Sequence, residues 1–216
     1  MSESTTFESL NLDAHLLDRL DALGYEVATP VQAMAIPPAI EGKDVLATAR
    51  TGTGKTAAFV LPILQTHRPG VIICPTRELA LQVVNEIERL SGLDNIATAL
   101  IGGASMKKQI QQLTEWPEAI LVATPGRICD HMERGNVDLN QYDVLVLDEA
   151  DEMLSMGFAD DLEYIVEQMN PDTRPSSSRR RCQSTFKSLQ TEFSKNRSRY
   201  ERQGQRNDHQ ALSNNL

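Results

Sequence analysis

The stretch Ala49-Arg50-Thr51-Gly52-Thr53-Gly54-Lys55-Thr56 decides the fold of this 216-residue chain, because it links a short apolar run at 45–47 to a helix-length segment. Two glycines, Gly52 and Gly54, allow a tight backbone turn in which successive N–H groups point at phosphate oxygens. The helix that follows adds the positive end of its dipole. This order of strand, glycine-rich turn and helix predicts a phosphate-binding loop, or P-loop.

The side chains of the same stretch have the chemistry that a nucleoside triphosphate and its metal require. Lys55 is predicted to reach the β- and γ-phosphates, and the Thr56 hydroxyl is predicted to ligate Mg²⁺. Thr51 and Thr53 complete the predicted nucleotide-binding loop. The strict pattern begins with glycine where this chain has Ala49. A glycine-rich strand-to-helix turn with an unrelated lysine is the alternative interpretation.

Strand-length and helix-length segments alternate along most of the chain. Short apolar runs rich in β-branched residues suit strands that are buried on both faces, and they lie at 45–47, 71–74, 98–101, 120–123 and 144–147. Helix-length segments lie at 56–65, 77–90, 106–113, 126–134 and 160–169, preceded by predicted helices at 10–23 and from Pro30 onward. The alternation predicts an α/β fold in which helices cover both faces of a parallel sheet and ligands bind at the carboxyl ends of the strands.

Acidic residues follow directly on the last of these apolar runs, in the order Asp148-Glu149-Ala150-Asp151. The carboxylates therefore emerge at the carboxyl end of a predicted strand, beside the P-loop. Asp148 suits Mg²⁺ binding through metal-bound water, and Glu149 is placed to orient or deprotonate the water that attacks the γ-phosphate. A helix N-terminus enriched in acids is the alternative.

Composition excludes some classes of protein and divides the chain in two. Residues 173–216 carry ten Lys and Arg against three Asp and Glu, a net charge of +7, whereas residues 1–172 carry 11 against 27, a net charge of −16. An acidic body does not bind nucleic acid through its overall field, so such binding needs local sites. No apolar run is long enough to span a membrane, and no signal peptide precedes the body, so a cytoplasmic location is expected. Three separated cysteines are expected to be reduced thiols rather than metal ligands.

With these motifs in place, residues 7–174 resemble the DEAD-box RNA helicases, bacterial ones in particular. The resemblance implies a RecA-like domain that binds ATP and Mg²⁺. It includes Gly24-Tyr25 and Thr29-Pro30-Val31-Gln32, which are similar to the family's Q motif. By that similarity Gln32 is expected to hydrogen-bond the adenine edge, with Phe7 and Tyr25 packed near the base. A surface glutamine before a helix is the alternative.

Three further motifs are similar to the family's RNA-contacting segments, and all follow predicted strands. The expected RNA-binding residues are Pro75, Thr76, Arg77, Gly102, Gly103, Thr124, Pro125, Gly126 and Arg127. Helix N-termini and glycine amides can hold phosphates there, so the implied specificity is for RNA backbone geometry rather than base sequence. Arg77 and Arg127 could instead be structural partners of acidic residues such as Glu149 or Asp151.

The resemblance divides the chain into a helicase ATP-binding domain at 1–174 and a basic tail at 175–216 that is predicted to be disordered. A second RecA-like domain, required for full activity in the family, is not expected within these residues. The family's Ser-Ala-Thr motif is also missing, and residues 176–183 occupy its place. One legal coding string for that run, read two nucleotides later, encodes Phe-Phe-Ser-Ala-Thr-Met-Pro. A frameshift is therefore one explanation of the tail, and a deliberate truncation is the other.

Three functions follow as hypotheses. The first is an RNA-dependent ATPase by ancestry, coupled to duplex unwinding only within a full-length enzyme. The second is a module that binds nucleotide or RNA without appreciable hydrolysis. The third, a P-loop enzyme acting on a small molecule, is disfavoured by the RNA-type motifs.

Overall fold

The computed structural model describes residues 5–47 and 52–169 of the chain. Its sheet contains four parallel strands in the order β2-β3-β1-β4. The strands are β1 (Gly70–Ile73), β2 (Ala97–Leu100), β3 (Ile120–Ala123) and β4 (Val144–Leu147). Four of the predicted strands are therefore confirmed to within one residue. Because parallel neighbours need crossover connections, a helix separates each strand from the next strand along the chain.

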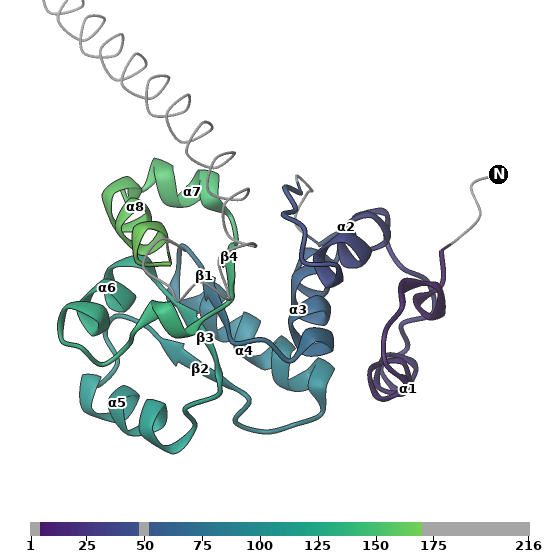
Figure 1. Ribbon diagram of the computed structural model, residues 1–216, viewed down its shortest axis with the longest axis horizontal. Coiled ribbons are helices and arrows are strands. Elements are labelled where there is room, and N and C mark those ends of the chain that lie inside the picture. The colour runs from purple at the N-terminus through teal and green to yellow at the C-terminus, as the bar shows by residue number, and fades with distance from the viewer. Residues whose placement is uncertain (1–4, 48–51, 170–216) are drawn as a thin grey trace, which may run out of the picture.

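Helices pack on both faces of this sheet, as the alternating pattern predicted (Figure 1). They are α1 (Ala14–Ala22), α2 (Pro30–Ile40), α3 (Lys55–Thr66), α4 (Arg77–Ser91), α5 (Met106–Glu115), α6 (Pro125–Glu133), α7 (Ala150–Ser155) and α8 (Ala159–Gln168), with 3₁₀ turns η1 (Phe7–Leu10) and η2 (Leu139–Gln141). The short helix α7 was not predicted, although the acid-rich helix start considered for this segment is present, with Asp151 and Glu152 in its first turn.

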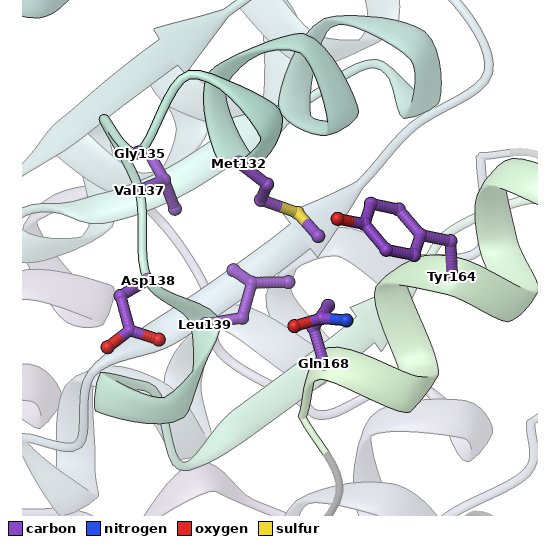
Figure 2. Close-up of a pocket in the computed structure, with 7 residues that line it drawn as sticks. All are labelled: Met132, Gly135, Val137, Asp138, Leu139, Tyr164 and Gln168. Atoms are coloured by element: carbon purple, nitrogen blue, oxygen red, sulfur yellow. The ribbon is translucent and has the colours of Figure 1, made fainter.

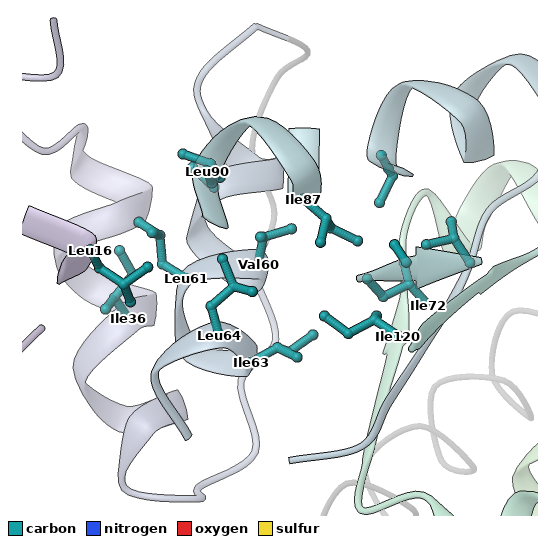
Figure 3. Close-up of a cluster of buried hydrophobic side chains, with 14 of the residues drawn as sticks. Leu16, Ile36, Val60, Leu61, Ile63, Leu64, Ile72, Ile87, Leu90 and Ile120 are labelled. Carbon is teal, nitrogen blue, oxygen red and sulfur yellow. The ribbon is translucent and has the colours of Figure 1, made fainter. Parts of the chain in front are cut away.

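Strand side chains alternate between two hydrophobic clusters, one on each face of the sheet. Ile72 and Ile120 face the cluster formed with α3 and α4, which Figure 3 shows continuing outward to Leu16 and Ile36. Val71 and Leu121 face the second cluster, with α6 and α8. The central strands β1 and β3 are thus buried from both sides, which is why their sequences are continuous apolar runs rather than alternating ones.

The run at 45–47 is not a strand, contrary to the prediction. Val45 and Leu46 lie outside the sheet with 38% and 70% of their surfaces exposed. A run of three residues can form only a few hydrogen bonds to a neighbouring strand. This run connects α2 to the P-loop, and α2 packs directly against α3. In the described residues β4 therefore pairs only with β1, and all four of its residues are partly exposed.

Cys74 and Cys129 are buried free thiols, as expected. Burial raises the pKa of both, that of Cys129 to about 12. None of the helices formed by the described residues is long and apolar enough to cross a membrane. The expectations for Thr51, for the tail at 175–216 and for a frameshift near 175 fall outside the described residues.

Candidate nucleotide- and RNA-binding site

The glycines of the predicted P-loop have the left-handed backbone conformation that a tight turn requires. Gly52 and Gly54 have φ angles of +80° and +84°, in the left-handed region that side chains disfavour. Gly54 is the N-cap of α3, and Lys55 is the first helical residue. The free N–H groups of this helix end therefore lie beside the turn, as phosphate binding requires.

Gln32 holds the Q-motif helix against the P-loop. Its side-chain Oε1 accepts a hydrogen bond from the Thr29 backbone N–H at 2.9 Å, which completes a capping box at the start of α2. Its Nε2 donates to the Gly54 carbonyl at 3.1 Å. Gln32 is buried, so it is not the surface glutamine of the alternative interpretation. Its amide thus bonds backbone groups at the N-termini of both α2 and α3.

Asp148 lies at the end of β4, as predicted, and its backbone N–H donates to the Ile73 carbonyl at 2.9 Å. The residue is only 9% exposed. Burial raises the pKa of its carboxyl group, while the positive charge of Lys55 acts in the opposite direction. No ion pair among residues 5–47 and 52–169 includes Asp148. A desolvated carboxylate that is close to a lysine but forms no ion pair is suited to a cationic ligand.

Glu149 has an unusual backbone conformation for its residue type. Its φ and ψ angles are +54° and +48°, which cost a residue with a Cβ about 1–2 kcal/mol relative to glycine. The hydrogen bond with Glu152 and burial raise the pKa of the Glu149 carboxyl group, and Lys55 again opposes the rise. Strain of this kind is typical of functional sites. The left-handed conformation of Glu149 turns the chain from β4 into α7.

The residues around Lys55 fit a magnesium ion that is bound together with phosphates. Mg²⁺ is usually held by one or two protein groups, with water and phosphate oxygens filling its other positions. The Asp148 carboxylate and the Thr56 hydroxyl are oxygen donors of the preferred kind. The described residues contain no cluster of three or more His, Cys, Asp or Glu that could hold a metal without a nucleotide.

Phe7 and Tyr25, the two aromatic residues expected near the base, contact each other. The rings of Phe7 and Tyr25 meet edge to face, with centroids 5.9 Å apart. The hydroxyl group of Tyr25 accepts from Arg89 Nη2 at 2.6 Å and donates to Glu86 Oε1 at 3.2 Å. Arg89 also pairs with Glu86. Glu86 and Arg89 were missed in the sequence because a charged pair on an exposed helix face normally indicates only solvation.

The three predicted RNA-contacting segments come together around one turn, Gly102–Gly103. Gly103 has a φ angle of +73°, and a Cβ at this position would overlap the guanidinium group of Arg77, so that side chain lies against the turn. From the other side, Arg127 Nη1 donates to the Ala104 carbonyl at 3.1 Å. Neither arginine forms an ion pair with a described residue, so the alternative of structural pairing with Glu149 or Asp151 is not observed.

The other residues of these segments start the helices that follow the strands. The hydroxyl group of Thr76 caps α4 by accepting from the Leu79 N–H at 3.2 Å. Thr124 is the N-cap of α6, with Pro125 in the first turn and Gly126 exposed beside it. Pro75 is buried and directs the chain from β1 into α4. The two helix N-termini therefore lie at the carboxyl ends of β1 and β3.

A separate hollow lies between α6, η2 and α8, and none of its lining residues belongs to the P-loop (Figure 2). None of its lining residues was predicted to bind a ligand, and none is basic: Met132, Gly135, Val137, Asp138, Leu139, Tyr164 and Gln168. It lacks the positive charge that a phosphate ligand needs, so it is not the nucleotide site.

The parallel sheet, the glycine turn before α3 and the carboxylates after β4 together define a RecA-like nucleotide-binding domain of the helicase type. Two solved structures share this arrangement. One is a hypothetical ATP-dependent RNA helicase from Sulfolobus tokodaii (TM-score 0.70, 35% identity, 79% of this chain and 49% of that chain). The other is a DEAD box protein from Methanococcus jannaschii (TM-score 0.71, 40% identity, 78% of this chain and 48% of that chain).

The chain belongs to the DEAD/DEAH box helicase family, which residues 29–188 match. It is 48% identical over 175 residues to the ATP-dependent RNA helicase CshA of Limosilactobacillus reuteri, covering 78% of this chain and 35% of the relative. It is 44% identical over 169 residues to the DEAD-box ATP-dependent RNA helicase CshA of Bacillus subtilis, covering 74% of this chain and 34% of the relative. The chain therefore spans about a third of the length of these relatives.

Proposed function

We propose that this chain provides the ATP- and RNA-binding half of a DEAD-box RNA helicase. The observation that carries the proposal is the position of Lys55 at the start of α3. From there its positive charge opposes the rise in the pKa values of Asp148 and Glu149, which follow β4. A lysine beside a glycine turn, close enough to two carboxylates for its charge to oppose the rise in their pKa values, is suited to phosphoryl transfer from a metal-bound triphosphate.

The roles proposed for the nucleotide site follow from this placement. Lys55 binds the outer phosphates, and the amides of Gly52, Thr53 and Gly54 hold the phosphate chain. Thr56 and Asp148 hold Mg²⁺, which when bound neutralises phosphate charge. Glu149 orients the attacking water and accepts its proton. Thr51 belongs to the same loop, as proposed from the sequence.

The base is proposed to lie on the side of the P-loop formed by α2. Phe7 and Tyr25 provide apolar surface near the base, and Gln32 hydrogen-bonds its edge. The bonds to Thr29 and Gly54 use one N–H and one lone pair of the Gln32 amide, which leaves one donor and one acceptor position for the adenine edge. This side chain thereby links base recognition to the shape of the phosphate loop.

RNA is proposed to bind along the Gly102–Gly103 turn and the N-termini of α4 and α6. Arg77 and Arg127 supply the positive charge, and backbone amides supply further donors to phosphates. The convergence of three segments on one turn supports a single continuous contact rather than three unrelated ones.

Efficient hydrolysis and unwinding are proposed to need a second RecA-like domain, in keeping with the chain matching only about a third of its relatives. By the family resemblance, the second domain supplies arginines that stabilise the transition state, and loss of such an arginine costs roughly 10³–10⁵ in the rate of phosphoryl transfer. We therefore expect the 216-residue chain to bind nucleotide and RNA but to hydrolyse ATP very slowly.

The test is binding of a fluorescent ATP analogue to the 216-residue chain in the presence of Mg²⁺, with a coupled ATPase assay run with and without RNA. Lys55→Ala should weaken nucleotide binding by at least about tenfold, or 1.4 kcal/mol. Lys43→Ala is the matched control, because the Lys43 side chain is 68% exposed and pairs with the exposed Glu41. Equal nucleotide affinities for the two variants would contradict the proposal.

A further inference from the structure

Helix α5 buries a glutamine where an amphipathic helix would normally bury apolar side chains. Of its ten residues, only Gln109 is buried, with 3% of its surface exposed. Ile110 on the same helix is 37% exposed. Burying an amide without hydrogen bonds is strongly unfavourable, because the group loses its bonds to water and gains none. Gln109 must therefore be held in place by partners that satisfy it.

Those partners lie next to the Gly102–Gly103 turn and on α6, the helix that carries Arg127. The Nε2 group of Gln109 donates to the Ile101 carbonyl at 3.0 Å. Its Oε1 accepts from Arg127 Nη1 at 3.0 Å and from His131 Nε2 at 2.9 Å. One amide thus joins the end of β2 to two residues of α6, over three of the four hydrogen bonds that it can make.

The glycine turn is fixed at both ends by this network. Ile101, which precedes Gly102–Gly103, is held through its carbonyl by Gln109. Ala104, which follows the turn, is held through its carbonyl by the same Arg127 nitrogen that bonds Gln109. A change in the Gln109 amide therefore alters the anchoring of the turn and the position of Arg127 together.

Arg127 is anchored in a way that leaves part of its guanidinium group available. Both of its hydrogen bonds within the described chain use Nη1, and its Nε and Nη2 groups have no partner there. A guanidinium fixed through one nitrogen presents the remaining N–H groups in a set direction, which suits a phosphate oxygen. A freely rotating arginine would lose more conformational entropy on binding.

We propose that Gln109 is a positioning residue for RNA binding: it sets the Gly102–Gly103 turn and the guanidinium of Arg127 in the geometry that receives an RNA phosphate, without contacting RNA itself. The inference rests on the proposed RNA-binding function. It adds a residue that belongs to none of the RNA-contacting segments identified in the sequence.

The test compares Gln109→Met with the parent chain and with Gln111→Ala. Methionine preserves the volume of the buried side chain but removes the amide, and Gln111 is an exposed glutamine of the same helix that bonds Glu115. Affinity for a labelled single-stranded RNA is measured by fluorescence anisotropy at several salt concentrations, alongside affinity for a fluorescent ATP analogue.

Gln109→Met should weaken RNA binding roughly tenfold, with nucleotide affinity changed by less than about twofold and Gln111→Ala like the parent. The slope of log affinity against log salt should fall by about 0.7, the value for one lost phosphate contact to a single strand. In an Arg127→Ala background, Gln109→Met should have little further effect, because both changes remove the same contact.

A purely structural role would lower RNA and nucleotide affinity together and leave the salt slope unchanged, and this result would overturn the inference. Additive effects of Gln109→Met and Arg127→Ala would also overturn it. If Gln109→Met does not fold, Gln109→Ala is subjected to the same comparison. Absence of RNA binding by the parent chain would instead overturn the proposed function, and the inference with it.

Discussion

Gln32 and Gly54 are joined by a hydrogen bond of 3.1 Å from the glutamine Nε2 to the glycine carbonyl, and this bond connects the Q-motif helix to the phosphate loop. The two residues are 22 positions apart in sequence. Gly54 has no Cβ, and the Gln32 amide occupies the space that one would need. The contact therefore depends on both residue types, an amide on one side and a glycine on the other.

Gly54→Ala should destabilise the chain more than Gly52→Ala. Both residues have positive φ angles, so each substitution introduces backbone strain of about 1–2 kcal/mol. Only at Gly54 does the added methyl group overlap a side chain, since nothing lies within 4 Å of the Cβ position at Gly52. Urea unfolding without nucleotide measures the difference. Equal midpoints for the two variants would show that Gln32 moves aside without cost.

Asp148→Asn should raise the thermal stability of the ligand-free chain while weakening binding of the magnesium nucleotide. Burial raises the pKa of Asp148, so the folded state favours the neutral carboxyl group. The stability that this group contributes is present below its unfolded pKa and is lost as the pH rises through the folded pKa. The advantage of the asparagine variant should thus grow with pH from about pH 4 and then level off. Melting temperatures between pH 4 and pH 8 measure it, and an advantage that shrinks with rising pH would contradict the assignment.

Glu149→Gly should be more stable than Glu149→Ala, by about 1 kcal/mol, because glycine adopts the left-handed conformation of this residue without strain. The same pair of substitutions at Glu152 is the control, since that residue lies within α7. There the order should reverse, because glycine in a helix costs roughly 0.8–1.0 kcal/mol relative to alanine. If alanine is the more stable substitution at both positions, strain at Glu149 is absent.

The buried network around His131 should make stability depend on pH near neutrality. Burial lowers the pKa of His131, and the charge of Arg127 lowers it further, whereas Asp130 acts in the opposite direction and Arg134 adds a smaller lowering. Its Nε2–H donates to Gln109 and its Nδ1 accepts from Asn136, so the bonded form is the neutral ring.

Because the unfolded histidine binds a proton more readily than the folded one, stability is full above the unfolded pKa of about 6.5 and falls as the pH drops toward the lowered folded value. His131→Gln should reduce this slope of unfolding free energy against pH between pH 7 and pH 5. The exposed His67 provides the control substitution, His67→Gln. An unchanged slope in His131→Gln would assign the pH dependence to other groups.

Local sequence was sufficient for much of the fold and for the centre of the site. Continuous apolar runs predicted β1, β3 and β4, and burial on both faces, which parallel strands usually have, is complete in β1 and β3 and partial in β4. The glycines before Lys55 and the acids after β4 were identified because a tight turn requires glycine, and carboxylates that follow an apolar run are placed at the end of a strand. Both features are visible within a few residues of sequence. The run at 45–47 was assigned wrongly, since the same apolar composition can occur in a strand or in a connecting segment.

The amino-acid sequence by itself determined which glycines turn the chain before α3 and which carboxylates follow β4, because backbone conformation and strand burial depend on residues nearby in the sequence. Tertiary structure alone decided that Gln32 reaches Gly54, that Arg89 holds Tyr25, and that Gln109 gathers Ile101, Arg127 and His131. These bonds join elements distant in sequence. A buried polar side chain bonds whichever donors and acceptors the packed elements bring beside it. Its partners therefore cannot be predicted from the neighbouring sequence.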